Sequence, residues 1–259
     1  MLDAFHISAG SMQAHQTHVD VIANNLSNAN TTGFKKSKVE FEDLMYRELA
    51  AAAGTLVRPD LTHPVGLGTT TAAIEKIFSQ GEAKGTDRNL DLLIQGKGFF
   101  EVLLPDGGAA YSRTGHLQID AEGLLVNADG YPLNPALQIP ADAQDVLVSP
   151  EGVVSVLLPE RDQPLELGVI ELAAFMNPGG LTPMGDNLYA VSGASGDAFY
   201  GAPGEDDFGV LAQGFLEASN VSLIEELTNM MVAQRGYEMG AKVIQAADEM
   251  LGIINNLRR

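Results

Sequence analysis

The chain has 259 residues, of which 45% are hydrophobic, so it can bury one large core or two smaller ones. A net charge of −19 opposes binding to nucleic acid or anionic lipid, and the lack of cysteine excludes disulfides and thiolate chemistry. We expect neither a cleaved signal peptide nor membrane insertion, because the N-terminus lacks a basic region and no apolar run could span a bilayer.

The first 30 or so residues predict a single helix without an internal proline. Such a helix is about 40 Å long at about 1.5 Å per residue. Asn28, Asn30 and Gly33 supply a stop signal after it. Its apolar residues recur at alternating steps of three and four, which is the spacing of a coiled-coil seam. The seam consists of Leu2, Phe5, Ala9, Met12, Gln16, Val19, Ala23 and Leu26.

The last stretch of the chain, from about Ser222, predicts a second long helix. Ser222 and Glu225 fit a capping box, in which the two residues satisfy each other's backbone donors. Two apolar stripes follow on different faces, so this helix needs cover on two sides. One stripe is Leu223, Leu227, Met230, Gln234, Tyr237, Ala241, Ile244 and Leu251, and the other is Val243, Ala247, Met250, Ile254 and Leu257.

The two terminal helices could pack on each other within one chain as a hairpin. That arrangement alone leaves the second stripe of the last helix in water, so contacts with neighbouring copies satisfy the pattern better. We therefore predict assembly interfaces on both helices. The residues are Leu2, Phe5, Met12, Val19 and Leu26 on the first helix, and Leu227, Met230, Tyr237, Ile244, Val243, Met250 and Ile254 on the last.

The middle of the chain has a different pattern. Residues 34–49 suggest an extended-to-helical connector, and residues 50–68 suggest a loop or extended arm. From about residue 85 to 190, short apolar runs alternate with glycine-containing turns every eight to twelve residues, which is typical of an antiparallel sandwich or barrel-like body. Residues 193–209 are rich in Gly, Ala and Asp and predict a loop. Strands are expected at 90–94, 99–104, 110–113, 117–120, 124–127, 146–148, 153–157 and 167–175.

The predicted fold class is α+β, with the two terminal helices paired as a coiled coil around a central antiparallel β-rich domain. The expected division is 1–33 with 219–259 for the helical domain, 34–84 for the connector and arm, and 85–218 for the β-rich outer domain.

The residues that could form metal or catalytic sites are better explained as parts of a helix, of hairpin turns and of a loop. His15 and His18 lie near Asp20 on one helix, but no further ligand cluster accompanies them. The Asp-Gly turns at 106–107, 120–123 and 129–130 lack the alternating acidic spacing of an EF-hand and fit hairpin turns. The acidic residues 205–207 lie in a predicted loop that would not hold a catalytic geometry. We expect no metal, cofactor or catalytic site.

Distinctive stretches occur at residues 20–35 (DVIANNLSNANTTGFK) and at residues 95–100, 111–115 and 123–126. The first resembles the N-terminal signature of the bacterial flagellar rod and hook protein family, and the others resemble the central domain of that family. Residues 214–221 and 231–238 resemble its C-terminal signature. The resemblance extends over nearly the whole chain, in order. Signature residues are Asn24, Asn25, Leu26, Asn28, Gly33, Phe34, Gln234 and Tyr237.

Within this family, the length and residues 41–46 (FEDLMY) are most similar to distal-rod members, and a proximal-rod paralogue or a hook-type protein is the alternative. The resemblance implies a self-assembling structural subunit whose helices line an axial export channel while the β body lies outside. It also implies that a segment from about Tyr46 to Leu67 stiffens the rod.

The implied partners are copies of the chain, other rod proteins, the hook protein, the rings around the rod and the type III export apparatus, which would deliver the subunit to a basal-body rod that spans the periplasm.

Two other classes of function fit the sequence less well. A peptidoglycan hydrolase would need a positioned pair of carboxylates, which the sequence does not offer. A monomeric binding module would need a β body that holds a ligand and terminal helices that are stable without neighbours.

Overall fold

The structure is a computed structural model that describes residues 2–44, 46–48, 64–159, 163–205 and 207–257. The chain divides into two compact units. Unit 1 contains residues 1–27, 37–75 and 222–259, and unit 2 contains residues 28–36 and 76–221. The chain therefore passes from one unit to the other four times, and each unit is described by itself.

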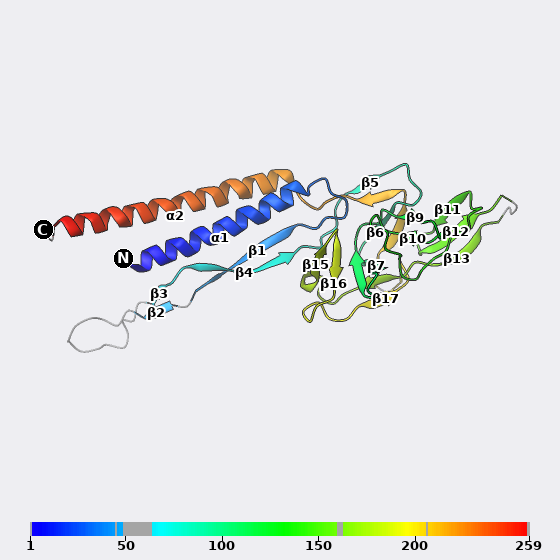
Figure 1. The fold of residues 1–259 in the computed structure, drawn as a ribbon, viewed down its shortest axis with the longest axis horizontal. Coiled ribbons are helices and arrows are strands. Elements are labelled where there is room, and N and C mark those ends of the chain that lie inside the picture. Colours follow the sequence, from blue (N-terminus) through cyan, green and yellow to red (C-terminus); the bar gives the residue numbers. More distant parts are fainter. Residues whose placement is uncertain (1, 45, 49–63, 160–162, 206, 258–259) are drawn as a thin grey trace. The chain divides into compact units, whose positions relative to one another are not determined.

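Unit 1 contains a long helix from each end of the chain. The helices α1 (Leu2–Ser27) and α2 (Leu223–Leu257) lie side by side and antiparallel (Figure 1). The backbone N–H of Glu225 lies 3.5 Å from the hydroxyl of Ser222, so Ser222 caps α2 as its position in the sequence predicts. The prediction of a helix at both ends is confirmed.

Unit 1 also contains strands where the sequence suggested a connector and a loop. The expectation of partly helical structure in residues 34–49 is wrong for the described residues. Val39 and Phe41 alternate with charged residues, and this period of two favours a strand. Most of the arm at 50–68 lies outside the described residues. The strands are β1 (Ser37–Asp43), paired with β4 (Thr69–Lys76), and β2 (Tyr46–Glu48), paired with β3 (Pro64–Gly66).

Unit 2 is an antiparallel β body, as predicted, but it consists of several small sheets. The largest described sheet has four strands in the order β15-β16-β8-β7, and a second has three in the order β11-β12-β13. Two-stranded pairs are β5 with β19, β6 with β18, β9 with β10, and β14 with β17.

The first strands of unit 2 are β5 (Ala83–Gly85), β6 (Leu92–Gln95), β7 (Phe100–Leu103), β8 (Ala109–Ser112), β9 (Gln118–Ile119) and β10 (Leu125–Val126). They are followed by β11 (Asp145–Val148), β12 (Val153–Leu157), β13 (Leu165–Val169), β14 (Leu172–Ala174), β15 (Thr182–Gly185), β16 (Leu188–Ala190), β17 (Phe199–Gly201), β18 (Val210–Gln213) and β19 (Phe215–Glu217).

Two sequence predictions in this body are wrong. The single strand expected at 167–175 is two strands, because β13 pairs with β12 whereas β14 pairs with β17. The loop expected at 193–209 contains β17 itself. A three-residue strand with exposed side chains and glycines around it carries too little alternation to be seen in a sequence.

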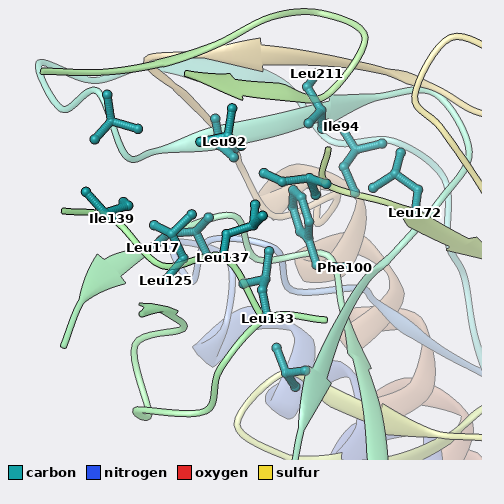
Figure 2. Packing of buried hydrophobic residues seen from close by; sticks show 14 of the residues in the cluster. Leu92, Ile94, Phe100, Leu117, Leu125, Leu133, Leu137, Ile139, Leu172 and Leu211 are labelled. Atoms are coloured by element: carbon teal, nitrogen blue, oxygen red, sulfur yellow. The ribbon is translucent and has the colours of Figure 1, made fainter. Parts of the chain in front are cut away.

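The core of unit 2 is aliphatic around one buried phenylalanine. Leu92, Phe100, Leu125 and Leu172 are each no more than 1% exposed and come from four different strands (Figure 2). Each such side chain contributes about 1.5–3 kcal/mol when it leaves water. A second cluster, made of Phe99, Tyr111, Ala173, Phe175, Leu181 and Tyr189, lies beside β14.

Candidate assembly site on the terminal helices

Helix α1 approaches α2 closely because α2 has glycines at the contact. A Cβ atom on Gly236 would lie 2.5 Å from Nε2 of His15, and one on Gly240 would lie 2.6 Å from Cγ of Met12. Both distances are shorter than any real contact, so the side chains of α1 occupy the space that larger residues on α2 would need. The two helices thus pack through large residues on α1 and small residues on α2.

The other side of α1 faces β1, and Asn25 joins all three elements. Its side chain is buried, and its Oδ1 accepts a hydrogen bond from the backbone N–H of Ser37 at 2.8 Å. Its Nδ2 donates to the backbone carbonyl of Ser37 at 2.8 Å and to Oε2 of Glu226 on α2 at 3.2 Å. The signature residue Asn25 therefore ties α1 to β1 and α2.

Helix α2 leaves most of its large apolar side chains exposed. Ala233 and Ala247 are buried on the α1 side, whereas Ile224 is 81% exposed. An apolar surface of this extent on one helix is typical of a protein–protein contact. The exposed apolar residues are Leu223, Ile224, Leu227, Met231, Val232, Tyr237, Met239, Val243, Met250, Leu251, Ile253 and Ile254.

The buried side of α1 is rotated relative to the seam seen in the sequence. The predicted interface residues Phe5, Met12, Val19 and Leu26 are half-buried, whereas Ala9, Gln16 and Ala23 of the same seam are exposed. The side chain of Leu2 lies outside what the structure describes. The buried positions are instead Ser8, Ala14, Ile22 and Asn25. The reason is that α1 packs on two sides, so no single heptad stripe describes its contacts.

The predicted interface residues of α2 fall into two groups. Met230 and Ile244 are half-buried beside the small residues that face α1. Leu227, Tyr237, Val243, Met250 and Ile254 are exposed and available to another molecule. Their role as contacts between copies stays a prediction.

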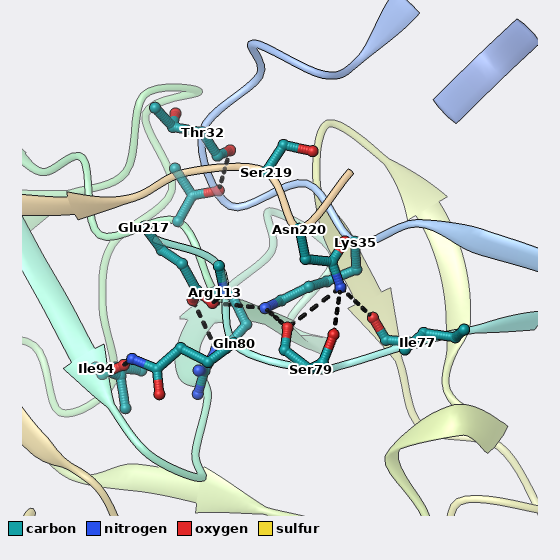
Figure 3. A network of polar contacts seen from close by, with 12 residues as sticks. Thr32, Lys35, Ile77, Ser79, Gln80, Ile94, Arg113, Glu217, Ser219 and Asn220 are labelled. Atoms are coloured by element: carbon teal, nitrogen blue, oxygen red, sulfur yellow. Dashed lines mark hydrogen bonds and ion pairs between the residues drawn. The ribbon is translucent and has the colours of Figure 1, made fainter. Parts of the chain in front are cut away.

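In unit 2, a buried ionic network joins residues that are far apart in the sequence. Glu217 on β19 lies between two cations: its Oε1 accepts from Nζ of Lys35 at 2.6 Å, and its Oε2 accepts from Nε of Arg113 at 3.1 Å (Figure 3). The side chains of all three residues are at most 4% exposed. Lys35 also donates to the carbonyl of Ser79 at 2.7 Å. We call Lys35, Arg113 and Glu217 the buried triad.

Further hydrogen bonds join the two chain segments that flank Lys35 and Glu217, residues 33–36 and 217–220. The backbone N–H of Gly33 donates to the carbonyl of Glu217 at 2.8 Å, and Oδ1 of Asn220 accepts from the backbone N–H of Lys36 at 2.8 Å. Gly33 has a φ of +71°, and a Cβ there would lie 2.4 Å from Oγ1 of Thr114. Both the left-handed backbone and the close approach explain why this signature position holds glycine.

The triad changes the protonation behaviour of its surroundings. Burial lowers the pKa of Lys35, and the neighbouring charge of Glu217 opposes this effect. Burial also raises the pKa of Tyr189 to about 12, with the charge of Glu217 as a smaller contribution. The carboxylate of Glu217 thus offsets part of the cost of burying the Lys35 ammonium.

The other candidate residues have structural partners or lie on the surface. His15 and His18 flank the ring of Phe41, whose centroid is 5.5 Å from that of His18. Oδ1 of Asp120 accepts two backbone N–H groups of its own turn, and Asp207 pairs with Lys97.

Among the described residues, no group of three or more His, Asp or Glu side chains could hold a metal ion. None of the described helices is long and apolar enough to cross a bilayer.

Comparisons with known proteins place the chain in a family. It is 46% identical to the flagellar basal-body rod protein FlgG of Borreliella burgdorferi, with all of both chains covered. It is 42% identical to FlgG of Caulobacter vibrioides over 99% of this chain, and 39% identical to FlgG of Bacillus subtilis over all of it. The chain belongs to the FlgG family of flagellar basal-body rod proteins.

Three family models match successive parts of the chain. The model of the flagella basal body rod protein matches residues 5–35, that of the FlgE/F/G D1 domain matches 93–156, and that of the FlgEFG C-terminal region matches 212–257. Lys35, Arg113 and Glu217 each fall in a different match. The buried triad is therefore where the three regions that define the rod family meet in this chain.

The sequence did not single out the triad. The signature stretches contain all three members, but a charged residue is expected to be solvated unless its partner in the fold is known. The sharpest available signal was Lys35 directly after the signature residues Gly33 and Phe34.

Proposed function

We propose that the chain is the structural subunit of the flagellar distal rod, which assembles with copies of itself into a hollow, stiff shaft. The rod identity rests on the full-length likeness to FlgG proteins. The observation that favours assembly is the exposed apolar surface of α2, because a helix in water gains stability when such a surface is covered.

In this proposal α1 and α2 pair as a coiled coil and form the inner domain that lines the export channel. The domain boundaries proposed from the sequence, 1–33 with 219–259, 34–84 and 85–218, describe an inner helical layer, a connector and an outer β layer. Residues 46–67 would supply the stiffness of the distal rod.

The proposed location is the basal-body rod, reached through the flagellar export apparatus. The proposed partners are further copies, other rod proteins, the hook protein and the rings that surround the rod. In this role the transmitted load is torque, and no chemical step is required of the subunit.

Electron microscopy of the purified protein at rising concentration tests this function. We expect straight tubular polymers from the wild-type chain. The triple variant Val243→Asp, Met250→Asp and Ile254→Asp places charges on the exposed surface of α2 and should abolish them, while the near-ultraviolet tyrosine signal of the β body stays unchanged.

Gln245→Asp is the matched control, since Gln245 is exposed and polar on the same helix. It adds a charge without removing apolar surface, so its polymers should resemble those of the wild type. Polymers from the triple variant at the wild-type concentration would contradict the role of α2. A wild-type chain that stays monomeric at every concentration would instead favour a binding module.

A further inference from the structure

Unit 2 has a small pocket beside the buried triad. Its volume is about 280 Å³. Three aromatic rings, those of Phe78, Phe99 and Phe175, line it together with Ala174 and the guanidinium-bearing Arg113. Lys97 also lines the pocket and pairs with Asp207 on the surface. The guanidinium carbon of Arg113 lies 5.9 Å from the centroid of the Phe99 ring. We call this the aromatic–arginine pocket.

Arg113 has hydrogen-bonding capacity left over. Its Nε donates to Glu217, and its Nη1 donates to the carbonyls of Gly96 at 2.9 Å and Gly98 at 2.6 Å. Its Nη2 makes no hydrogen bond to any described residue, although the side chain is only 4% exposed. Gly96 and Gly98 also line the pocket, so Arg113 brings an unpartnered donor group to its wall.

The charges at the pocket do not balance. Glu217 is the one carboxylate that pairs with both Lys35 and Arg113, and both of its oxygens are occupied, since Oε1 also accepts the backbone N–H of Gly81 at 2.8 Å. Two cations thus share one carboxylate, so the triad carries one positive charge in excess. An anion that entered the pocket would therefore be stabilised by a charge-assisted hydrogen bond.

We propose that the aromatic–arginine pocket receives an acidic side chain from a second copy of this chain. The carboxylate would pair with Nη2 of Arg113, while its apolar stem packs against the aromatic rings. This inference rests on the proposed self-assembly and names one contact within it.

Charge complementarity favours a second copy of the chain as the source of the acidic side chain. Arg161 is the only lysine or arginine between Arg113 and Arg235, whereas acidic residues recur throughout that stretch. Several of them, including Glu122, Glu166 and Asp186, are exposed on unit 2. A neighbouring copy therefore offers exposed carboxylates that the cationic pocket can receive. A contact between a pocket and a different surface of the next copy is heterologous, and such contacts build open helical polymers when the rotation between copies does not close a ring.

The first test uses the wild-type chain below its polymerising concentration. We would titrate 4-methylpentanoate, a short branched carboxylate, and follow the NMR signals of the Arg113 Nε–H and of the Gly96 and Gly98 amides. We expect saturable shifts with the carboxylate and none with 4-methylpentanol, which has the same shape without the charge.

The second test fills the pocket from within. Ala174 lines it, so Ala174→Glu supplies a carboxylate in cis, and Ala174→Gln supplies a similar volume without charge. We expect Ala174→Glu to unfold at a higher temperature than Ala174→Gln. We also expect it to raise the critical concentration for polymers about tenfold or more, because a desolvated charge pair is lost between copies.

The outcomes separate this inference from the rod function. Polymers of Ala174→Glu at the wild-type critical concentration overturn the second-copy assignment and leave the rod function standing. The absence of any carboxylate-dependent shift overturns the anion pocket. A wild-type chain that forms no polymer overturns both proposals, even where 4-methylpentanoate binds.

Discussion

The buried triad of unit 2 and the outer surface of α2 place side chains in opposite environments. Unit 2 buries Lys35, Arg113 and Glu217, whose charges prefer water, whereas α2 exposes Ile224 and its neighbours, which avoid it. Both the buried charges and the exposed apolar side chains are energetically unfavourable in an isolated chain. Internal hydrogen bonds and ion pairs offset part of the desolvation cost of the triad, while the exposed surface of α2 gains stability only when another molecule covers it.

The largest expected effect comes from breaking the triad. Glu217→Gln removes the carboxylate that pairs with two buried cations, and we expect the free energy of unfolding of unit 2 to fall by about 3–5 kcal/mol. Urea unfolding followed by the near-ultraviolet tyrosine signal measures it, since four of the six tyrosines (Tyr111, Tyr131, Tyr189 and Tyr200) lie in unit 2.

Glu166→Gln is the control for this change, because Glu166 is exposed and should tolerate the loss of its charge within about 0.5 kcal/mol. A Glu217→Gln variant as stable as the Glu166→Gln variant would show that the triad does not stabilise unit 2.

A second test compares two isoleucines on the two helices. Ile22 on α1 is 2% exposed and Ile224 on α2 is 81% exposed. We expect Ile22→Ala to cost about 2–5 kcal/mol of monomer stability and Ile224→Ala less than about 0.5 kcal/mol. Far-ultraviolet circular dichroism at 222 nm during urea unfolding reports both, because α1 and α2 are the α-helices of the described residues.

The variant with the smaller effect on monomer stability, Ile224→Ala, should have the larger effect on polymer formation. Ile224→Ala removes exposed apolar surface and should raise the critical concentration for polymers although the monomer is unharmed. An equal loss of monomer stability in both variants would contradict the difference in burial between the helices.

The sequence predicted the parts of this structure that depend on local patterns. Helices at both ends follow from long runs without proline, and the antiparallel body follows from short apolar runs separated by glycine turns. β1 is not evident in the sequence because its alternation consists only of Val39 and Phe41, and the nearby Phe34 and Leu44 do not continue it. The segment that the family resemblance links to stiffness lies mainly outside the described residues.

What the sequence did not predict depends on contacts between distant residues. The predicted seams consist mainly of large apolar side chains. The contact of α2 with α1 is instead made where Gly236 and Gly240 allow His15 and Met12 to approach. Likewise, the burial of Lys35 depends on Glu217 and Arg113, and no local pattern shows that these three residues meet. The periodicity of apolar residues identifies a face of a helix, but it does not show which face lies closest to the neighbouring helix.

A third prediction concerns the glycines of α2. Gly236→Ala would place a methyl group 2.5 Å from the ring of His15, and we expect a loss of about 1–3 kcal/mol in helix-pair stability. Gly252→Ala meets nothing within 4 Å and should stabilise α2 by up to about 1 kcal/mol, since alanine favours the helix. Thermal unfolding at 222 nm distinguishes the two, and a gain from both changes would mean that His15 moves aside freely.

The smallest expected effect is a dependence of unit 1 on pH through His18. Burial lowers its pKa from the ordinary value of 6.5, the nearby His15 on α1 lowers it further, and Glu226 on α2 opposes both, while β1 contributes the uncharged ring of Phe41. Well above pH 6.5 both folded and unfolded chains carry a neutral His18, so it has no effect. As the pH falls below that value the unfolded chain takes up the proton more readily, and helix-pair stability should decline until the lowered pKa is passed. Urea unfolding at 222 nm between pH 7.5 and pH 5.5 should show a steeper decline for the wild type than for His18→Gln, and equal slopes would remove His18 as the cause.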